Sequence, residues 1–127
     1  MRIAHVALWT ADLEASVAFW VDTFGAEAGE EYASRNRPGF RSRFLRLAEG
    51  ASLELMTGPW IEGAVEAAER PGWAHVAVSL GSPEAVDTLA ARCRASGQLV
   101  SGPRRTGDGY YEAVLRSPEG ALVEITG

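Results

Sequence analysis

The sequence has a single cysteine, Cys93, among 127 residues, so no disulfide bond can form within the chain. A chain without disulfides is typical of a reducing compartment, and this predicts a cytoplasmic protein. The N-terminal stretch carries charge too early for a secretory signal, and no apolar run approaches the ~20 residues that cross a bilayer. We therefore expect no membrane partner.

Positive charge is also scarce, with 12 Lys and Arg against 17 Asp and Glu and a net charge of -5. Arginines do gather between Arg35 and Arg46, but glycine and phenylalanine interrupt them. This pattern fits a local anion pocket better than the basic stripe that nucleic acid requires, so we expect no nucleic-acid partner. P-loop, GxGxxG, HExxH, GxSxG and CxxC patterns are lacking too, so nucleotide-cofactor, serine-hydrolase and thiol-redox functions gain no support.

An internal repeat is the main feature that the sequence does contain. The stretch IAHVAL near the N-terminus resembles WAHVAV in the second half, and EGASLEL resembles EGALVEI. His5 recurs as His75 and Glu54 recurs as Glu124, both at an offset of 70 residues, and the chain has no other histidine. Each half therefore carries one histidine near its start and one glutamate near its end.

Both halves also predict a helix after the histidine. Apolar residues at helical spacing between 12 and 25 indicate a helix that Thr10 or Asp12 caps and Gly25 ends. In the second half, Ser82 precedes a proline at the first helical position, and Gly97 ends the apolar pattern.

Short strands complete each half. Residues 43–47 are expected to pair with 52–56, and residues 111–116 with 122–126. Each half is then roughly β-α-β-β-β, which predicts an α+β fold. We expect one domain over 1–127 with modules at about 1–58 and about 73–127.

The four repeated residues are candidates for a metal site. Side chains alternate across a strand, so His5, Glu54, His75 and Glu124 lie opposite the apolar residues of their strands. Taken singly, each is more often a structural residue, but equivalent positions in two repeats favour a shared site. Two imidazoles and two carboxylates suit one divalent ion of Ni, Zn, Co, Mn or Fe, with positions left for substrate.

Four stretches of the chain resemble the vicinal oxygen chelate superfamily, which includes glyoxalase I, bleomycin-resistance proteins, extradiol dioxygenases and methylmalonyl-CoA epimerases. They are AHVALWTADLEASVAFW, GASLELM, GWAHVAVSLGS and SPEGALVEITG. The order His, Glu, His, Glu is most similar to the glyoxalase I branch. The resemblance implies two βαβββ modules that form a cupped mixed sheet around the metal, commonly in a homodimer, with the site closed within one chain or between two.

The resemblance also implies a chemistry, in which a metal chelates two neighbouring oxygens of a small substrate and stabilises an enolate-like intermediate. His5, Glu54, His75 and Glu124 would be the ligands, and Glu54 or Glu124 would also move the substrate proton. This is the activity of a lyase or isomerase. The alternatives are a drug-binding module of bleomycin-resistance type, and a ring-cleaving extradiol dioxygenase, whose two-His, one-Glu ligand set fits less well.

Two departures from the glyoxalase pattern concern glutathione. Glutathione-using members typically carry arginine four residues after the first histidine, where this chain has Trp9. They typically carry asparagine four residues after the first glutamate, where it has Gly58. The substrate is therefore not expected to be the glutathione hemithioacetal of methylglyoxal.

Five further residues are candidates for binding the substrate. Trp9 shares a strand face with His5, and one of Tyr110 and Tyr111 is expected to face the cup, although packing explains these rings equally well. Arg37 and Arg43 are suited to bind a carboxylate or phosphate, although a solvated arginine face is the commoner arrangement.

Overall fold

The computed structural model describes residues 3–62, 73–107 and 109–127, and both predicted helices form there with the expected caps. Helix α1 (Leu13–Phe24) starts after Asp12, whose side chain accepts a hydrogen bond from the Ala15 N–H at 3.0 Å. It ends at Gly25, which adopts a left-handed φ of 67°. Helix α2 (Pro83–Ala95) starts after Ser82, which accepts from the Ala85 N–H at 3.2 Å.

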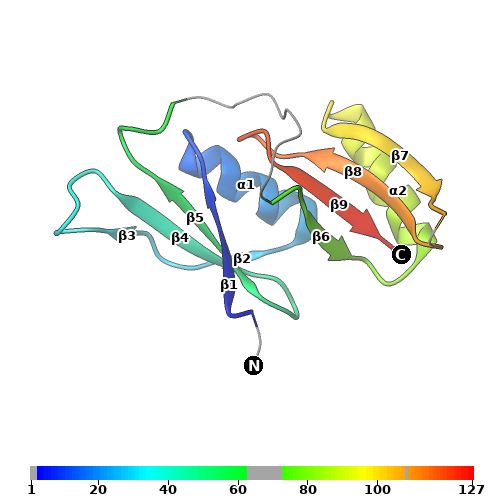
Figure 1. Ribbon diagram of the computed structural model, residues 1–127, viewed down its shortest axis with the longest axis horizontal. Coiled ribbons are helices and arrows are strands. Elements are labelled where there is room, and N and C mark those ends of the chain that lie inside the picture. The colour runs from blue at the N-terminus through cyan, green and yellow to red at the C-terminus, as the bar shows by residue number, and fades with distance from the viewer. Residues whose placement is uncertain (1–2, 63–72, 108) are drawn as a thin grey trace. The chain divides into compact units, whose positions relative to one another are not determined.

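The chain divides into two compact units, Met1–Val65 and Glu66–Gly127, and each contains one mixed sheet. In the first unit β5 lies parallel to β1 and antiparallel to β4, and β2 and β3 both pair with β4 (Figure 1). These strands are β1 (His5–Trp9), β2 (Glu27–Ala28), β3 (Tyr32–Ala33), β4 (Arg41–Arg46) and β5 (Ser52–Thr57).

The second unit repeats this order as β6-β9-β8-β7, with β9 parallel to β6 and antiparallel to β8 (Figure 1). Its strands are β6 (Val76–Ser79), β7 (Leu99–Arg105), β8 (Tyr111–Arg116) and β9 (Leu122–Thr126). The predicted α+β class and both predicted strand pairs are confirmed. The two units differ after the helix, where the first has the short strands β2 and β3 in place of the single strand β7.

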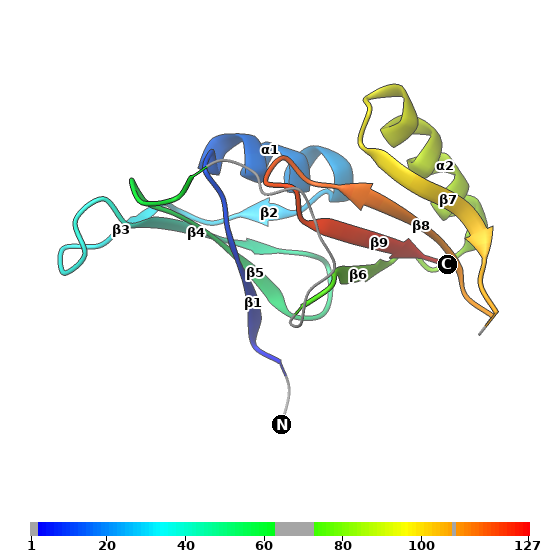
Figure 2. The same ribbon diagram turned by 45° about the horizontal axis from the view of Figure 1, so that its top comes forward.

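Each helix covers one face of its own sheet, as Figure 2 shows for α1 and α2. The fully or nearly fully buried side chains of the first unit include Leu13, Trp20 and Leu55, and those of the second include Val86 and Ile125. Burial of such side chains stabilises each by roughly 1.5–3 kcal/mol. The opposite face of each sheet therefore lies away from its own helix, and this is the face that carries the histidine and the glutamate.

Among the described residues, no helix is both long and apolar enough to span a membrane.

Candidate functional site

The first unit brings His5 and Glu54 together on the face of its sheet that α1 leaves uncovered. Glu54 on β5 lies beside Ala7 on β1, and His5 is two residues before Ala7, so the two side chains point the same way. The His5 Nε2 and Glu54 Oε2 atoms are 3.8 Å apart. Phe44 of β4 pairs with Glu54, and its ring lies edge-on to the His5 imidazole with the ring centroids 5.4 Å apart.

The second unit builds the same pair with nearly the same geometry. Glu124 on β9 lies beside Ala77 on β6, two residues after His75. The His75 Nε2 and Glu124 Oε2 atoms are 3.6 Å apart. The histidine side chains are 46% and 44% exposed and the glutamates 17% and 18% in the first and second units. The sequence repeat is therefore also a repeat of one His–Glu pair.

Each pair fits half of a metal site. Two ligand atoms bound to one ion at about 2.1 Å lie about 3.0–3.4 Å apart at octahedral or tetrahedral angles, so a shift of a few tenths of an ångström closes either pair on a metal. Imidazole nitrogen and carboxylate oxygen are both ordinary ligands of Zn, Ni, Co, Mn and Fe(II). Within the part of the chain that the structure describes, no three histidine, cysteine, aspartate or glutamate side chains form a single group.

Trp9 and Arg37, two of the predicted substrate contacts, lie together in the first unit. Trp9 ends β1 on the same face as His5, and it is 41% exposed. The guanidinium of Arg37 stands 5.6 Å from the Trp9 ring centroid and 4.1 Å from that of Trp60. Trp60 was not expected from sequence, because it follows the last strand of the module in a stretch with no periodic pattern.

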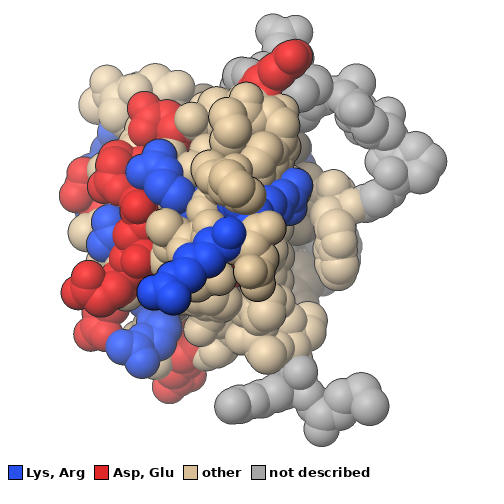
Figure 3. Space-filling model, turned by 90° about the vertical axis from the view of Figure 1, so that its left-hand side faces the viewer, with Lys and Arg blue, Asp and Glu red and all other residues tan. Residues whose placement is uncertain are grey.

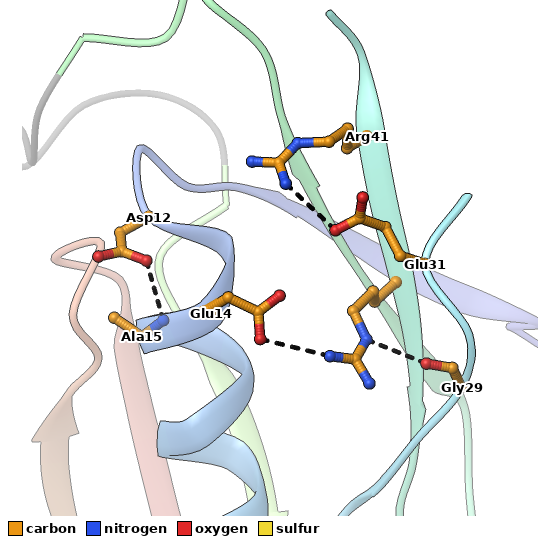
Figure 4. A network of polar contacts seen from close by, with 7 residues as sticks. Asp12, Glu14, Ala15, Gly29, Glu31 and Arg41 are labelled. Carbon is orange, nitrogen blue, oxygen red and sulfur yellow. Dashed lines mark hydrogen bonds and ion pairs between the residues drawn. The ribbon is translucent and has the colours of Figure 1, made fainter. Parts of the chain in front are cut away.

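Arg43 lies on the other side of the same sheet. It pairs with Leu55, a core residue that faces α1, so its side chain points toward the helix. The Arg43 guanidinium donates to the Glu14 carboxylate at 3.5 Å and to the Gly29 carbonyl at 3.0 Å (Figure 4). The structure therefore does not bring Arg43 to the face that holds His5 and Glu54, and its contacts are those of a residue that ties β4 to α1.

Tyr111 also points toward a helix. It lies on β8 beside Arg105 of β7, and its hydroxyl donates to the Asp87 carboxylate of α2 at 2.6 Å. Glu124 pairs with Val114, whose side chain points to the opposite face of β8 from that of Tyr111. Tyr110 precedes the strand and is 58% exposed. Neither tyrosine is therefore placed beside the His75–Glu124 pair within the second unit.

The contact with Asp87 has a consequence for the pH dependence of stability. The hydrogen bond to Asp87, with burial and the charge of Asp87 as smaller causes, raises the pKa of the Tyr111 phenol above its usual value near 10. Because the folded state holds this proton more tightly, the stabilisation is fully present below pH 10 and is lost as the pH rises through the raised pKa. Asp87→Asn is expected to lower the pKa of Tyr111. Tyrosinate absorbance checks this in a background with Tyr32 and Tyr110 changed to Phe, and an unchanged titration would contradict it.

An ion pair on the open face of the second sheet was missed by the sequence reasoning. Glu112 pairs with Thr126 across β8 and β9, so it faces the same way as Glu124, and Arg104 contacts its Oε1 atom at 3.1 Å. The Glu112 side chain is only 10% exposed. The sequence did offer a signal for Glu112, because it is a carboxylate within a predicted strand at the position that Ser42 occupies in the first repeat. Arg104 stays 60% exposed beside this buried carboxylate.

Known proteins share this arrangement of elements. A model of the Glyoxalase/Bleomycin resistance protein/Dioxygenase superfamily matches residues 2–125. An uncharacterized protein of Pseudomonas aeruginosa is 34% identical over 131 residues, covering 98% of this chain and 86% of that protein. The crystal structure of a glyoxylase/bleomycin resistance protein/dioxygenase domain from Frankia has a TM-score of 0.85 at 17% identity, covering 99% of this chain and 96% of that one. The trypanothione-dependent glyoxalase I of Leishmania major has a TM-score of 0.77 at 18% identity, covering 100% and 86%. At these identities, the last two likenesses show a shared fold.

Proposed function

The chain belongs to the Glyoxalase/Bleomycin resistance protein/Dioxygenase superfamily, as its sequence motifs predicted, and on this premise we propose that it is a metal-dependent lyase or isomerase of glyoxalase I type. Its substrate would be a small metabolite with two neighbouring oxygen atoms. His5, Glu54, His75 and Glu124 would together hold one divalent ion of Ni, Zn, Co, Mn or Fe. The proposal includes a homodimer and a cytoplasmic location, and it leaves open whether one chain or two complete the site.

The observation that carries this proposal is the duplicated His–Glu pair. A single pair at 3.8 Å is compatible with an ordinary surface contact, since exposed ion pairs contribute little to stability. The same pair recurs at 3.6 Å in the other half, with nearly the same exposures and at equivalent repeat positions, and this repetition favours a shared role. Nearly half-exposed imidazoles beside mostly buried carboxylates also leave the ligand atoms open to an ion and a substrate.

The proposed chemistry divides between the ion and the two glutamates. A divalent ion held by these residues would supply Lewis-acid polarisation of the substrate oxygens. One carboxylate, that of Glu54 or Glu124, would take the proton from one of the two oxygen-bearing carbons and return it to the other. His5 would be held in place by β1, and His75 by β6, which begins at the next residue, and the edge-on ring of Phe44 would orient His5. Proton transfer by a positioned side chain is worth about 10²- to 10⁴-fold in rate.

Glutathione is not part of the proposed substrate. The two positions at which glutathione-using members carry arginine and asparagine hold Trp9 and Gly58 here. Neither residue offers a charged or amide side chain to a peptide, and Trp9 instead joins an aromatic cluster with Phe40 and Trp60.

A binding module of bleomycin-resistance type is the second candidate, and the same aromatic cluster favours it. Trp9 and Trp60 are 41% and 40% exposed on one end of the first unit, as expected of rings that stack on a flat ligand. A sequestering protein needs these rings but no metal.

Metal analysis of the wild-type protein separates the two functions. We expect about one divalent ion per chain after purification or after reconstitution with each of the five metals, and turnover of at least one 2-oxoaldehyde or 2-hydroxyketone in a substrate panel. Removal of the ion with a chelator should abolish turnover, and adding it back should restore it. Protein that takes up none of the five metals would refute the enzyme and leave the binding module.

A further inference from the structure

An arginine lies within a cluster of aromatic rings at one end of the first unit. The Arg37 guanidinium is 4.1 Å from the Trp60 ring centroid, 5.6 Å from that of Trp9 and 5.8 Å from that of Phe40. Trp9 meets Trp60 and Phe40 edge-on at 6.4 Å and 6.0 Å. The Trp9 ring therefore contacts both other rings, and the Arg37 cation lies near all three. We call Trp9, Arg37, Phe40 and Trp60 the arginine–aromatic cluster.

The backbone holds the parts of this cluster in place. Gly58 lies directly against the Trp60 indole, because a Cβ atom at residue 58 would overlap the six-membered ring of that side chain. Gly39 adopts a left-handed φ of 85° and touches the Pro59 ring, so the turn that carries Arg37 packs on the segment that carries Trp60. The Phe40 N–H donates to the Arg37 carbonyl at 3.0 Å and closes that turn.

The hydrogen-bonding edge of the Arg37 guanidinium is available. The three arginines of the adjacent strand β4 each have a carboxylate partner, Arg41 with Glu31, Arg43 with Glu14 and Arg46 with Glu27. The Arg37 backbone N–H donates to the Ser34 hydroxyl at 3.1 Å, but the residues that the structure describes give the Arg37 guanidinium no ion pair and no hydrogen bond. Stacking on a ring uses the face of a guanidinium and leaves its N–H groups, which lie in the plane, free to donate.

The cluster continues the face that carries His5 and Glu54. Trp9 pairs with Met56, which lies two residues along β5 from Glu54, so the backbone positions of Trp9 and Glu54 are offset by about 7 Å along the strand direction. Met56, which is partly buried, faces the same side of the sheet as Trp9 and Glu54 and adds an adaptable apolar side chain there. Figure 3 shows this end of the unit, where uncharged surface and arginine side chains adjoin and acidic residues gather to one side.

We infer that the arginine–aromatic cluster binds the carboxylate end of a planar aromatic substrate. The carboxylate accepts two hydrogen bonds from the Arg37 guanidinium, and the ring packs on Trp9 and Trp60. The offset of about 7 Å along the strand direction, close to the length of a two-ring molecule, would place the other end of such a molecule beside Glu54. The departures at residues 9 and 58 thus have a common explanation, because Trp9 supplies a ring and Gly58 makes room for Trp60. That the bound molecule is turned over rests on the proposed function, whereas the binding does not.

Binding of 2-naphthoate in the presence of EDTA tests the cluster separately from the metal. Calorimetry should detect binding to the wild-type protein, and much weaker binding of 2-naphthalenemethanol, which lacks the charge, and of cyclohexanecarboxylate, which lacks the aromatic ring. Arg37→Gln should raise the Kd of 2-naphthoate about tenfold or more. Arg37→Lys keeps the charge but loses the planar fork, and should raise it about three- to tenfold.

Two further variants complete the test. Arg35→Gln removes a neighbouring arginine with no described contact to the rings and should leave the Kd unchanged. Gly58→Ala should displace Trp60 and weaken binding as Arg37→Gln does, with the circular dichroism of the fold retained. No binding of 2-naphthoate to the wild type, or equal effects of Arg35→Gln and Arg37→Gln, would overturn the inference. If 2-naphthoate binds with the expected pattern but the protein takes up no metal, the proposed enzyme function is refuted and the binding inference stands.

Discussion

His5→Ala and His75→Ala are each expected to reduce the affinity for the divalent ion at least 100-fold. Loss of a residue that merely supports a ligand already costs about 10- to 100-fold in metal affinity, so loss of a ligand itself should cost more. The two variants should behave alike, because the two pairs have nearly the same distances and exposures. Elemental analysis after dialysis, beside competition with a chromophoric chelator, measures the effect. Glu14→Gln, which removes a carboxylate on the helix side of the first sheet, is the control.

The stoichiometry of these variants tests whether the ion is shared. A shared ion predicts that either variant loses nearly all the metal, whereas two independent pairs predict that each variant keeps the ion of the other half. Mixing the unfolded variants and refolding them together then shows where the site closes. If two chains of a homodimer complete each site, about a quarter of the wild-type metal should return, because half of the dimers are mixed and each has one intact site. If one chain completes it, none should return.

Replacing the glutamate that acts as the base is expected to lower kcat about 10²- to 10⁴-fold. Glu54→Gln and Glu124→Gln both keep an amide oxygen that can still bind the ion, so part of the metal affinity should remain in each. The variant at the base should stay inactive when saturated with metal, because glutamine cannot accept the substrate proton. The variant at the other position should regain most of its activity with added metal.

Exchange of the substrate C–H proton with solvent, followed by NMR in deuterium oxide, gives the clearest readout of this difference. The wild type and the metal-saturated non-base variant should exchange the proton, and the base variant should not. Glu112→Gln serves as a comparison, since Glu112 faces the same side as Glu124 but is paired with Arg104. Full activity in both Glu54→Gln and Glu124→Gln would exclude a glutamate base at these positions.

Much of the fold could be predicted from the sequence because the helix caps and the strand alternation depend on residues close together along the chain. The caps at Asp12 and Ser82 are satisfied by backbone N–H groups three residues away, so short-range chemistry determines where both helices begin. Strand alternation likewise placed His5 and Glu54 opposite the buried residues of their strands. The repeat offset of 70 residues then extended these inferences from one unit to the other. The structure adds the register, which repeats at the same offset, because Phe44 pairs with Glu54 and Val114 with Glu124.

The direction of single side chains was harder to predict where the sequence pattern was not periodic. Arg43 and Arg37 look alike in the sequence as members of one arginine cluster. The register of β4 on β5 turns Arg43 toward α1, whereas the turn before β4 lays Arg37 on the rings of Trp9 and Trp60. The choice depends on contacts between residues that are distant along the chain, which no local pattern records.

The sequence by itself determined the family, the helix boundaries and the two equivalent His–Glu positions, because each depends on residue type and short-range spacing. Only the tertiary structure decided that the His and Glu side chains of each pair lie within 4 Å of each other and that Glu112 is buried against Arg104. It also decided that the Trp60 indole occupies the space beside Gly58. These contacts depend on how strands pair and loops fold back, and an allowed strand pattern leaves many such arrangements open. Packing of the whole unit selects one of them.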